Sequence, residues 1–224
     1  MIVTVLLLVL IAALSYALGC LNGSLIISRR MFGVDIRSMG SGNAGATNFF
    51  RSFGRSGLLE VLAVDIGKGA LAAFLGGILL GLAAPEPEEL AYYREVGRAF
   101  ATFCCVMGHV FPAPFGFRGG KGILCGVACV FVMEYHAGLI CLLIFAIAVA
   151  ATRYVSLGSV LAALSVPVTA LAQGFSGLSM TLVCISVALV VLKHWQNIVR
   201  LIQHRESKID FRPDVSHKLD SEDF

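Results

Sequence analysis

Charged residues are scarce in this sequence: they make up 14% of its 224 residues, while hydrophobic residues make up 58%. Soluble domains are typically about 25% charged and about 45–50% apolar, so the composition excludes an ordinary soluble fold. The mean hydropathy of +0.86 agrees and predicts a polytopic membrane protein. The formal net charge is only +3, which is too small to indicate a nucleic-acid-binding protein.

Several motifs with well-defined chemistry are also missing. The seven cysteines form no CxxC pair and lie mostly within apolar segments, which favours inert, buried thiols over a metal or redox site. There is no GxxxxGKS/T loop, and no histidine is followed five residues later by an aspartate, as an HxxxxD acyltransferase requires. We also find no Ser-His-Asp set and no cluster of metal ligands, so we expect no metal and no other cofactor.

Seven long apolar segments are present, and each is typical of a helix. They cover residues 2–28, 57–83, 97–113, 122–136, 138–152, 155–173 and 177–193. The fourth and fifth are short for a hydrocarbon core that needs about 20 helical residues, so five or six spans are the alternative. The first has no preceding Lys or Arg and no small-residue cleavage site, and we expect it to be a retained span rather than a signal peptide.

The distribution of Lys and Arg predicts how these helices are oriented. If the N-terminus lies outside, the outer loops contain only Arg94 and Arg98, together with the acidic stretch PEPEEL. The cytoplasmic segments then hold Arg29, Arg30, Arg37, Arg51, Arg55, Arg118, Lys121, Arg153 and the basic residues from Lys193 onward. This bias predicts an all-α integral membrane protein of about seven transmembrane helices, with the N-terminus outside and the C-terminus cytoplasmic. We expect residues 1–210 to form one membrane domain and residues 211–224 a polar cytoplasmic tail.

Three polar segments between the helices have a composition that simple connections do not need. The first polar segment is residues 40–48 (GSGNAGATN), the second is residues 108–122 (GHVFPAPFGFRGGKG) and the third is residues 194–208 (HWQNIVRLIQHRESK). Glycine lets backbone amides approach a ligand closely, and Arg or Lys supplies charge for a phosphate. The predicted orientation places all three on the cytoplasmic side, which indicates a membrane enzyme that handles a phosphorylated substrate.

The first polar segment has the pattern of an anion-binding nest. Its glycines free the backbone, its Ser, Thr and Asn side chains offer hydrogen bonds, and an arginine follows. The candidate residues are Gly40, Ser41, Gly42, Asn43, Gly45, Thr47, Asn48 and Arg51. A glycine-rich turn that enters a helix is the alternative interpretation.

The second polar segment places a histidine and a lysine near glycines. Gly119, Gly120 and Gly122 would let Lys121 and nearby amides converge on an anion at the N-terminus of the next helix. His109, directly after Gly108, is a base or a hydrogen-bond donor in this interpretation. In the alternative interpretation, His109 is a structural residue whose hydrogen bonds are satisfied within the protein.

In the third polar segment, His194, Asn197 and Arg200 recur at helical spacing on adjacent faces. The alternative is an ordinary amphipathic helix with lipid-facing basic residues. A further charged pair, Asp65 and Lys68, lies within the second apolar segment. Charges are costly there, so the two residues are either paired with each other or functional.

Together, the three segments resemble the motifs of the acyl-phosphate:glycerol-3-phosphate acyltransferases of bacterial membranes, the PlsY family. The first matches SGNxGATN, the second matches GHxFPxxxxFxGGKG, and the third is similar to HRxNIxRLxxGxExK, with Glu206 and Lys208 at its end. The resemblance covers about residues 10–208. The chain departs from the family pattern at Pro114, Arg118, Trp195, Gln196 and His204.

The resemblance implies that an acyl group passes from an acyl phosphate to the sn-1 hydroxyl of glycerol 3-phosphate. The products would be lysophosphatidic acid and phosphate, in the first step of bacterial phospholipid synthesis. The enzyme would be a multi-pass protein among the lipids of the bacterial cytoplasmic (inner) membrane, active as a monomer, with its site on the cytoplasmic side. A phosphate or lipid transporter is the alternative, although no inverted repeat is evident.

The resemblance also implies roles for the residues above. The catalytic set is Ser41, Arg51, His109, Lys121, His194 and Asn197. The substrate-binding set is Gly40, Gly42, Asn43, Gly45, Thr47, Asn48, Asp65, Lys68, Gly108, Gly119, Gly120, Gly122, Arg200, Glu206 and Lys208. Because the donor is already activated, we expect direct attack without an acyl-enzyme. The proton would go to His109, to His194 or to a substrate phosphate oxygen.

Overall fold

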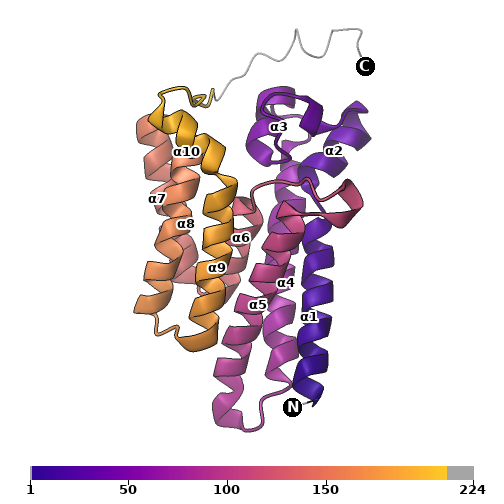
Figure 1. Ribbon diagram of the computed structural model, residues 1–224, viewed down its shortest axis with the longest axis vertical. Helices are drawn as coiled ribbons and strands as arrows, with labels where there is room; N and C mark the ends of the chain where they lie inside the picture. Colours follow the sequence, from indigo (N-terminus) through magenta and orange to yellow (C-terminus); the bar gives the residue numbers. More distant parts are fainter. Residues whose placement is uncertain (1, 211–224) are drawn as a thin grey trace.

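The computed structural model describes residues 2–210, which form helices joined by turns (Figure 1). Within that range the α-helices are α1 (Ile2–Cys20), α2 (Gly23–Phe32), α3 (Ala46–Phe53), α4 (Leu58–Gly81), α5 (Leu90–Val110), α6 (Ile123–Met133), α7 (Tyr135–Thr152), α8 (Val155–Ala172), α9 (Gly177–Lys193) and α10 (Trp195–Ile202). The predicted polar tail at 211–224 lies outside the described residues.

The long helices pack side by side in one bundle. In Figure 1, α1, α4 and α5 form one group, α7, α8 and α9 form another, and α6 lies between them. Small residues allow close packing where the groups meet, since the buried cluster there includes Ala72, Ala73, Cys105, Cys125 and Cys129. All seven cysteines are free thiols and six of them are buried, which agrees with the prediction of inert thiols.

Large apolar side chains cover the outside of the bundle. On α1 and α7, for example, Leu6, Leu143 and Ile147 are each at least 60% exposed. A helix face of this kind is costly in water and suits lipid. Together with the all-helical fold of the described residues, this supports the predicted integral membrane class.

Four helical stretches among residues 2–210 are long and apolar enough to cross a membrane, and the bent α9–α10 pair would be a fifth. The four are Ile2–Phe32, Pro87–Phe115, Tyr135–Thr152 and Val155–Ala172. In Figure 1, α1 and then α4 to α9 run alternately toward and away from the end that carries α2, α3 and α10. With 11 residues, α6 is about 16 Å long and reaches only part of the way across a ~30 Å core. The count of seven spans and the orientation stay predictions.

Within the stretch Ile2–Phe32 the chain breaks between α1 and α2, so the single helix expected over residues 2–28 is wrong in detail: it is two helices. At the break, the Asn22 side chain accepts a hydrogen bond from Leu25 N and donates one to Ala44 O. The first bond caps α2, and the second ties the break to the first polar segment. Apolar periodicity alone does not reveal such a cap, since Leu and Ile continue on both sides of it.

The start expected for the third helix, at residue 97, is also wrong. The helix α5 begins at Leu90, because its first turns pack Tyr93 and Val96 against Ile11 of α1 and Leu80 of α4. Similarly, α6 ends at Met133 and α7 begins at Tyr135, since Glu134 caps α7 by accepting a hydrogen bond from Ala137 N.

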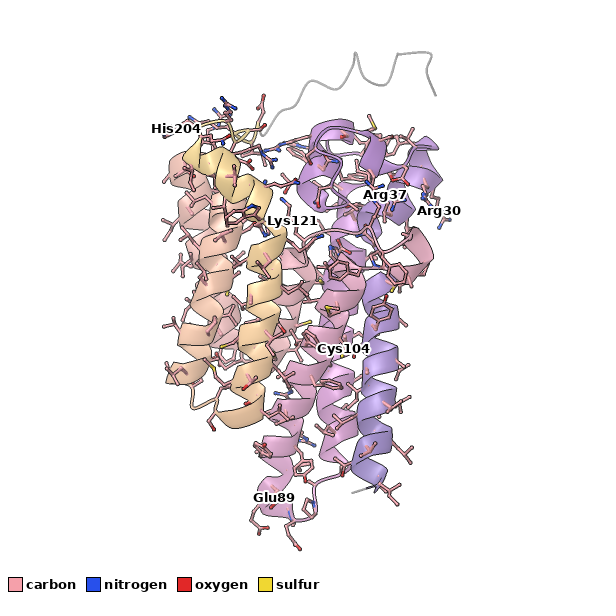
Figure 2. All side chains as sticks on the ribbon, viewed as in Figure 1. Arg30, Arg37, Glu89, Cys104, Lys121 and His204 are labelled. Carbon is pink, nitrogen blue, oxygen red and sulfur yellow. The ribbon has the colours of Figure 1, made fainter. Side chains whose placement is uncertain are left out.

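The three polar segments lie at one end of the bundle. Figure 2 shows Arg37, Lys121 and His204 at this end and Glu89, from the α4–α5 connection, at the opposite end. This convergence was predicted from the charge distribution, and it brings together residues that are far apart in the chain, such as Ser41 and Asn197, which line one cavity.

Candidate active site

A polar cavity of about 840 Å³, including its open mouth, lies where the three polar segments meet. We call it the central cavity. It is lined by Ser41, Asn43, Gly45, Ala46, Thr47, Asn48, Arg51, Asp65, His109, Lys121, Gly122, Ile123, Leu124, Val155, Ser156, Ser159, His194, Asn197, Arg200, Glu206 and Ser207. Most of the residues predicted from the sequence are therefore brought to one site.

The first polar segment is folded around the buried side chain of Asn48. Its Oδ1 accepts a hydrogen bond from Ser41 N at 2.9 Å, and its Nδ2 donates to the carbonyl oxygens of Ile36, Met39 and Asn43. A Cβ at Gly40 would lie 2.4 Å from Asn48 Oδ1, and Gly40 has a φ of +54°. Asn48 therefore shapes the loop, which leaves Ser41 and Asn43 to face the cavity.

Arg37 ties the second polar segment to the first. Its Nη1 donates to Phe115 O at 2.7 Å and to Arg118 O at 3.0 Å, while Nη2 pairs with Asp35 at 2.7 Å. Hydrogen bonding to Arg37, reinforced by Arg29, holds the pKa of Asp35 well below its usual range, so the carboxylate stays charged. Sequence reasoning placed Arg37 only in a basic loop and missed this positioning contact.

The third polar segment is organised by the buried carboxylate of Glu206. Its Oε1 accepts hydrogen bonds from Asn197 Nδ2 at 2.7 Å and Ser156 Oγ at 2.8 Å, and its Oε2 accepts one from Arg200 Nε at 2.8 Å. Burial raises the pKa of Glu206, but these hydrogen bonds outweigh it and the pKa is lowered overall. Glu206 is thus fully engaged with protein groups. Ser156, which sequence reasoning missed, lies in the first turn of the apolar helix α8 and belongs to no motif.

Lys121 lies at the centre of the cationic part of the cavity. Its Nζ donates to Asn197 Oδ1, so Asn197 bridges Lys121 and Glu206. Burial lowers the pKa of Lys121 to about 8, and the charges of Arg200, Arg51 and Lys193 add to this effect while Glu206 opposes it. Mutual repulsion among these cations makes the cavity a place where an added anion is stabilised.

A buried charge cluster lies beneath the cavity. Lys68 Nζ pairs with Asp65 Oδ1 at 2.7 Å and lies 2.8 Å from His109 Nδ1. It also donates to Gly19 O and Leu21 O at the break between α1 and α2. The two charges are therefore paired, as one of the two interpretations predicted, and they join α1, α4 and α5.

These contacts fix different tautomers for the two histidines of the cavity. Lys68 Nζ is only a donor, so in the neutral His109 ring Nδ1 accepts from it and Nε2 carries the hydrogen, while Asp65 Oδ1 lies farther away, 3.7 Å from the same Nδ1. His194 Nδ1 lies 2.8 Å from Val190 O, which is only an acceptor, so His194 Nδ1 carries the hydrogen and Nε2 has a free lone pair. His109 is thereby suited to donate a hydrogen bond and His194 to accept one. Burial, together with the charge of Lys121, lowers the pKa of His194 to about 4, so the ring is neutral when no substrate is bound.

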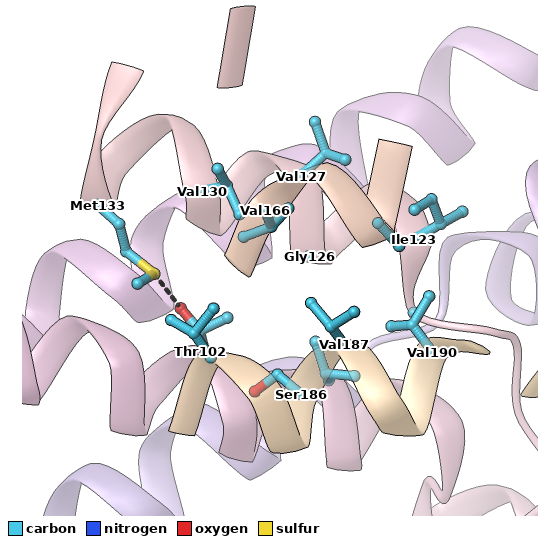
Figure 3. A pocket seen from close by; sticks show the side chains of 14 residues that line it. Thr102, Ile123, Gly126, Val127, Val130, Met133, Val166, Ser186, Val187 and Val190 are labelled. Atoms are coloured by element: carbon cyan, nitrogen blue, oxygen red, sulfur yellow. Dashed lines mark hydrogen bonds between the residues drawn. The ribbon is translucent and has the colours of Figure 1, made fainter. Parts of the chain in front are cut away.

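Two further cavities adjoin the central one. An outer polar pocket of about 730 Å³, including its open mouth, shares Ser41, Asn43, Lys121, Asn197 and Arg200 with it. An apolar groove of about 450 Å³, including its open side, shares Gly122 and Ile123 with it. The groove lies among α5, α6, α8 and α9 (Figure 3). The three spaces are thus contiguous, with a cationic middle, a polar side and an apolar side.

Seven of the predicted substrate-binding residues line none of these three cavities: Gly40, Gly42, Lys68, Gly108, Gly119, Gly120 and Lys208. Gly108 lies where α5 crosses α1, and Gly120 makes room for the His109 ring, whose Nε2 would be 2.2 Å from an added Cβ. Lys208 Nζ lies over the Tyr154 ring at 5.7 Å from its centroid. In this geometry these residues support the cavity wall, and direct substrate contact by them stays a prediction.

The lipid-suited helical bundle and the cationic cavity at one end of it define a multi-pass membrane protein with a site for anions. The sequence profile of the glycerol-3-phosphate acyltransferase family matches residues 9–204, so the chain belongs to that family. The glycerol-3-phosphate acyltransferase of Clostridioides difficile (strain 630) is 36% identical over 203 residues, covering 90% of this chain and 95% of that protein. That of Finegoldia magna is 35% identical and covers 90% and 96%.

The fold is similar to that of PlsY, an integral membrane glycerol 3-phosphate acyltransferase. Its crystal structure in the glycerol 3-phosphate form matches with a TM-score of 0.79 at 29% identity, covering 91% of this chain and 96% of that one. The lysophosphatidic acid form matches with a TM-score of 0.77 at 26% identity. These similarities confirm the family predicted from the three motifs.

Proposed function

We propose that this protein transfers an acyl group from an acyl phosphate to the sn-1 hydroxyl of glycerol 3-phosphate, releasing lysophosphatidic acid and phosphate. Its membership of the glycerol-3-phosphate acyltransferase family supports the acceptor and the class of reaction. One observation carries the finer proposal: the cationic central cavity opens into a polar pocket on one side and an apolar groove on the other. A donor with a phosphate head and an acyl tail fits across the cavity and the groove.

The acceptor has its own space in this scheme. Glycerol 3-phosphate would occupy the outer polar pocket, whose walls include Lys193 and Arg200. The residues that this pocket shares with the central cavity, Lys121 and Asn197 among them, would then lie between the two phosphates. Holding two reactants next to each other lowers the entropic part of the barrier, and nearby cations offset the repulsion of the two anions.

The chemistry needs no protein nucleophile. The acceptor hydroxyl oxygen forms a bond to the acyl carbonyl carbon, and the bond from that carbon to the phosphate oxygen breaks, with the electron pair leaving on phosphate. Arg51 and Lys121 would stabilise the leaving phosphate, because both are cations that line the cavity. Ser41 and Asn43 would add hydrogen bonds from the first polar segment.

The tautomers favour one assignment of the proton. His194 has its Nε2 lone pair available and would accept the hydroxyl proton, either directly or through a water molecule. His109 Nε2–H would instead donate a hydrogen bond toward the substrate or the loop. Asn197, held by Glu206, would orient the acceptor beside His194.

The placement in the membrane belongs to the same proposal. In the bacterial cytoplasmic membrane, with the N-terminus outside, the cationic end of the bundle would face the cytoplasm. The concentration of Lys and Arg at that end supports this orientation. The three cavities are formed by one chain, which supports activity as a monomer.

The test is phosphate release from palmitoyl phosphate by the purified protein in detergent, with and without glycerol 3-phosphate. Wild type and Lys121→Ala are compared with Arg55→Ala, which removes an exposed arginine that lines none of the three cavities. We expect acceptor-dependent release by wild type and Arg55→Ala, and a loss of at least about 100-fold in Lys121→Ala.

Two outcomes would contradict the proposal. If folded wild type releases no phosphate in response to the acceptor, the acyl-phosphate donor is wrong, and transport of a phosphate or lipid becomes the next function to test. If donor alone gives a burst of stable acyl-protein, the direct attack is wrong.

A further inference from the structure

Two side chains that contact each other mark one end of the apolar groove. In Figure 3, Ile123 and Val190 lie at one end, while Thr102 of α5 and Met133 of α6 meet at the other. Thr102 Oγ1 lies 3.3 Å from Met133 Sδ. The groove therefore runs from the central cavity along α6 to this contact, which we call the groove floor.

The length of the groove follows from α6. The helix runs for 11 residues from Ile123, at the cavity, to Met133, at the floor. Eleven helical residues span roughly 16 Å, and an extended alkyl chain of that length has about a dozen carbons. The distance from the cavity to the floor thus matches a medium to long acyl tail.

A charged group contacts one of the residues that form the floor. Arg98, one turn before Thr102 on α5, donates from Nη1 to Met133 O at 3.4 Å. Its Nε is buried and has no hydrogen-bond partner among the described residues. If the methyl end of an acyl chain pressed against this guanidinium, the charge would be further removed from water, which is unfavourable. The floor is therefore an energetic as well as a steric barrier to an apolar chain.

Gly126 lies partway along the same groove. An added Cβ there would meet only Val106 Cγ2, at an ordinary 3.7 Å, so a side chain at this position fits at its base and extends into the groove. Four residues separate Gly126 from Gly122, which corresponds to about 6 Å or roughly five carbons. The absence of a side chain keeps the groove open beyond that depth.

We infer that the groove measures the acyl chain of the donor: the Thr102–Met133 floor sets the longest tail that fits, and Gly126 allows tails to pass the midpoint. This inference rests on the proposed function. For wild type, kcat/KM rises with chain length to roughly a dozen to fourteen carbons and then stops rising.

The test measures kcat/KM for a series of acyl phosphates from 8 to 18 carbons, at saturating glycerol 3-phosphate, for two variants of opposite effect. Gly126→Phe blocks the groove midway, so we expect at least about a 10-fold fall in the 16-carbon to 8-carbon ratio of kcat/KM. Met133→Ala lowers the floor, so we expect kcat/KM to go on rising to chains about two carbons longer than in wild type.

Matched controls make the same changes outside the groove. Gly67→Phe places the same side chain on α4, where an added Cβ meets nothing within 4 Å. Met107→Ala removes a partly exposed methionine of α5 that does not line the groove. Both should keep the wild-type chain-length profile.

The outcomes separate this inference from the proposed function. If wild type is active but neither Gly126→Phe nor Met133→Ala changes its chain-length profile, the groove does not measure the acyl chain. The proposed reaction is then unaffected. A wild type that uses no acyl phosphate of any length overturns the reaction itself. If Gly126→Phe does not fold, the comparison of Met133→Ala with Met107→Ala is sufficient. If Met133→Ala does not accept longer acyl chains than Met107→Ala, the Thr102–Met133 contact does not limit the chain length.

Discussion

Lys68 of α4 places its Nζ 2.8 Å from Nδ1 of His109 on α5, inside the helical bundle. Lys68 also pairs with Asp65, and both side chains are only 2% exposed. Removing the ammonium leaves the buried Asp65 carboxylate with only Gly23 N and His109 Nδ1 among the described residues, at 3.2 and 3.7 Å, as partners. We therefore expect Lys68→Met to lower the free energy of unfolding by about 3–5 kcal/mol.

Thermal unfolding in detergent checks this prediction. The double variant Asp65→Leu with Lys68→Met should be more stable than Lys68→Met alone, because it removes the orphaned carboxylate. Lys193→Met is the control, since Lys193 is partly exposed at the polar end. If Lys68→Met is as stable as Lys193→Met, the buried pair does not join the helices as described.

His194 and His109 should respond differently to substitution. In the proposed mechanism His194, which lines the central cavity, accepts the proton through Nε2, so His194→Ala should lower kcat by about 100-fold or more with a smaller change in KM. His109→Gln keeps a donor in place of Nε2–H and should retain much more activity.

Steady-state kinetics of both variants, with fold checked by thermal unfolding, makes the comparison. Near-normal kcat in His194→Ala would assign the proton to a substrate phosphate oxygen instead. A larger loss in His109→Gln than in His194→Ala would reverse the two roles.

Sequence patterns predicted the convergence of the three polar segments, because helices that cross a bundle alternately return their connections to the same end. The bias of Lys and Arg located that end, and Lys121, Asn197 and Arg200 do line one cavity there. Helical spacing also placed His194 and Asn197 on one side of α10, where Asn197 is buried.

What the sequence could not reveal are contacts between distant segments. The break at Asn22 depends on Ala44, and the buried state of Glu206 depends on Ser156, which is 50 positions away. A glycine in a motif is equally ambiguous, since a ligand and a neighbouring helix both exclude a side chain. Gly108 illustrates this, because it lies within the motif but packs against α1.

The depressed pKa of Lys121 predicts the basic limb of the pH profile. Its ammonium in the empty enzyme loses its proton near pH 8, because burial and neighbouring cations disfavour the charge. As pH rises through about 8, kcat/KM for glycerol 3-phosphate should therefore fall. In the loaded enzyme the phosphates stabilise the ammonium, so the corresponding limb in kcat should lie at higher pH.

Lys121→Arg provides the check, since a guanidinium stays charged throughout the range. The variant should be less active but should lack the basic limb in kcat/KM, whereas Lys193→Arg should keep it. Rates are corrected for spontaneous hydrolysis of the acyl phosphate. A limb that persists unchanged in Lys121→Arg belongs to another group.

Gly108 allows a direct distinction between packing and substrate binding. A Cβ there would lie 2.2 Å from Tyr16 O and 3.0 Å from Cys20 N, both backbone atoms of α1 that cannot move independently. We therefore expect Gly108→Ala to destabilise the protein by about 1–3 kcal/mol, or more if α1 has to separate from α5. The measurement is thermal unfolding of the purified variant.

Gly67→Ala is the matched control for the same change in a helix. Its added Cβ meets nothing within 4 Å, so replacing glycine there should stabilise α4 by about 0.5–1 kcal/mol. If Gly108→Ala destabilises the protein and Gly67→Ala stabilises it, the close packing of α1 against α5, rather than helix propensity, decides the stability of Gly108→Ala. A Gly108→Ala protein of normal stability with a raised KM for either substrate would return Gly108 to the substrate-binding set implied by its motif.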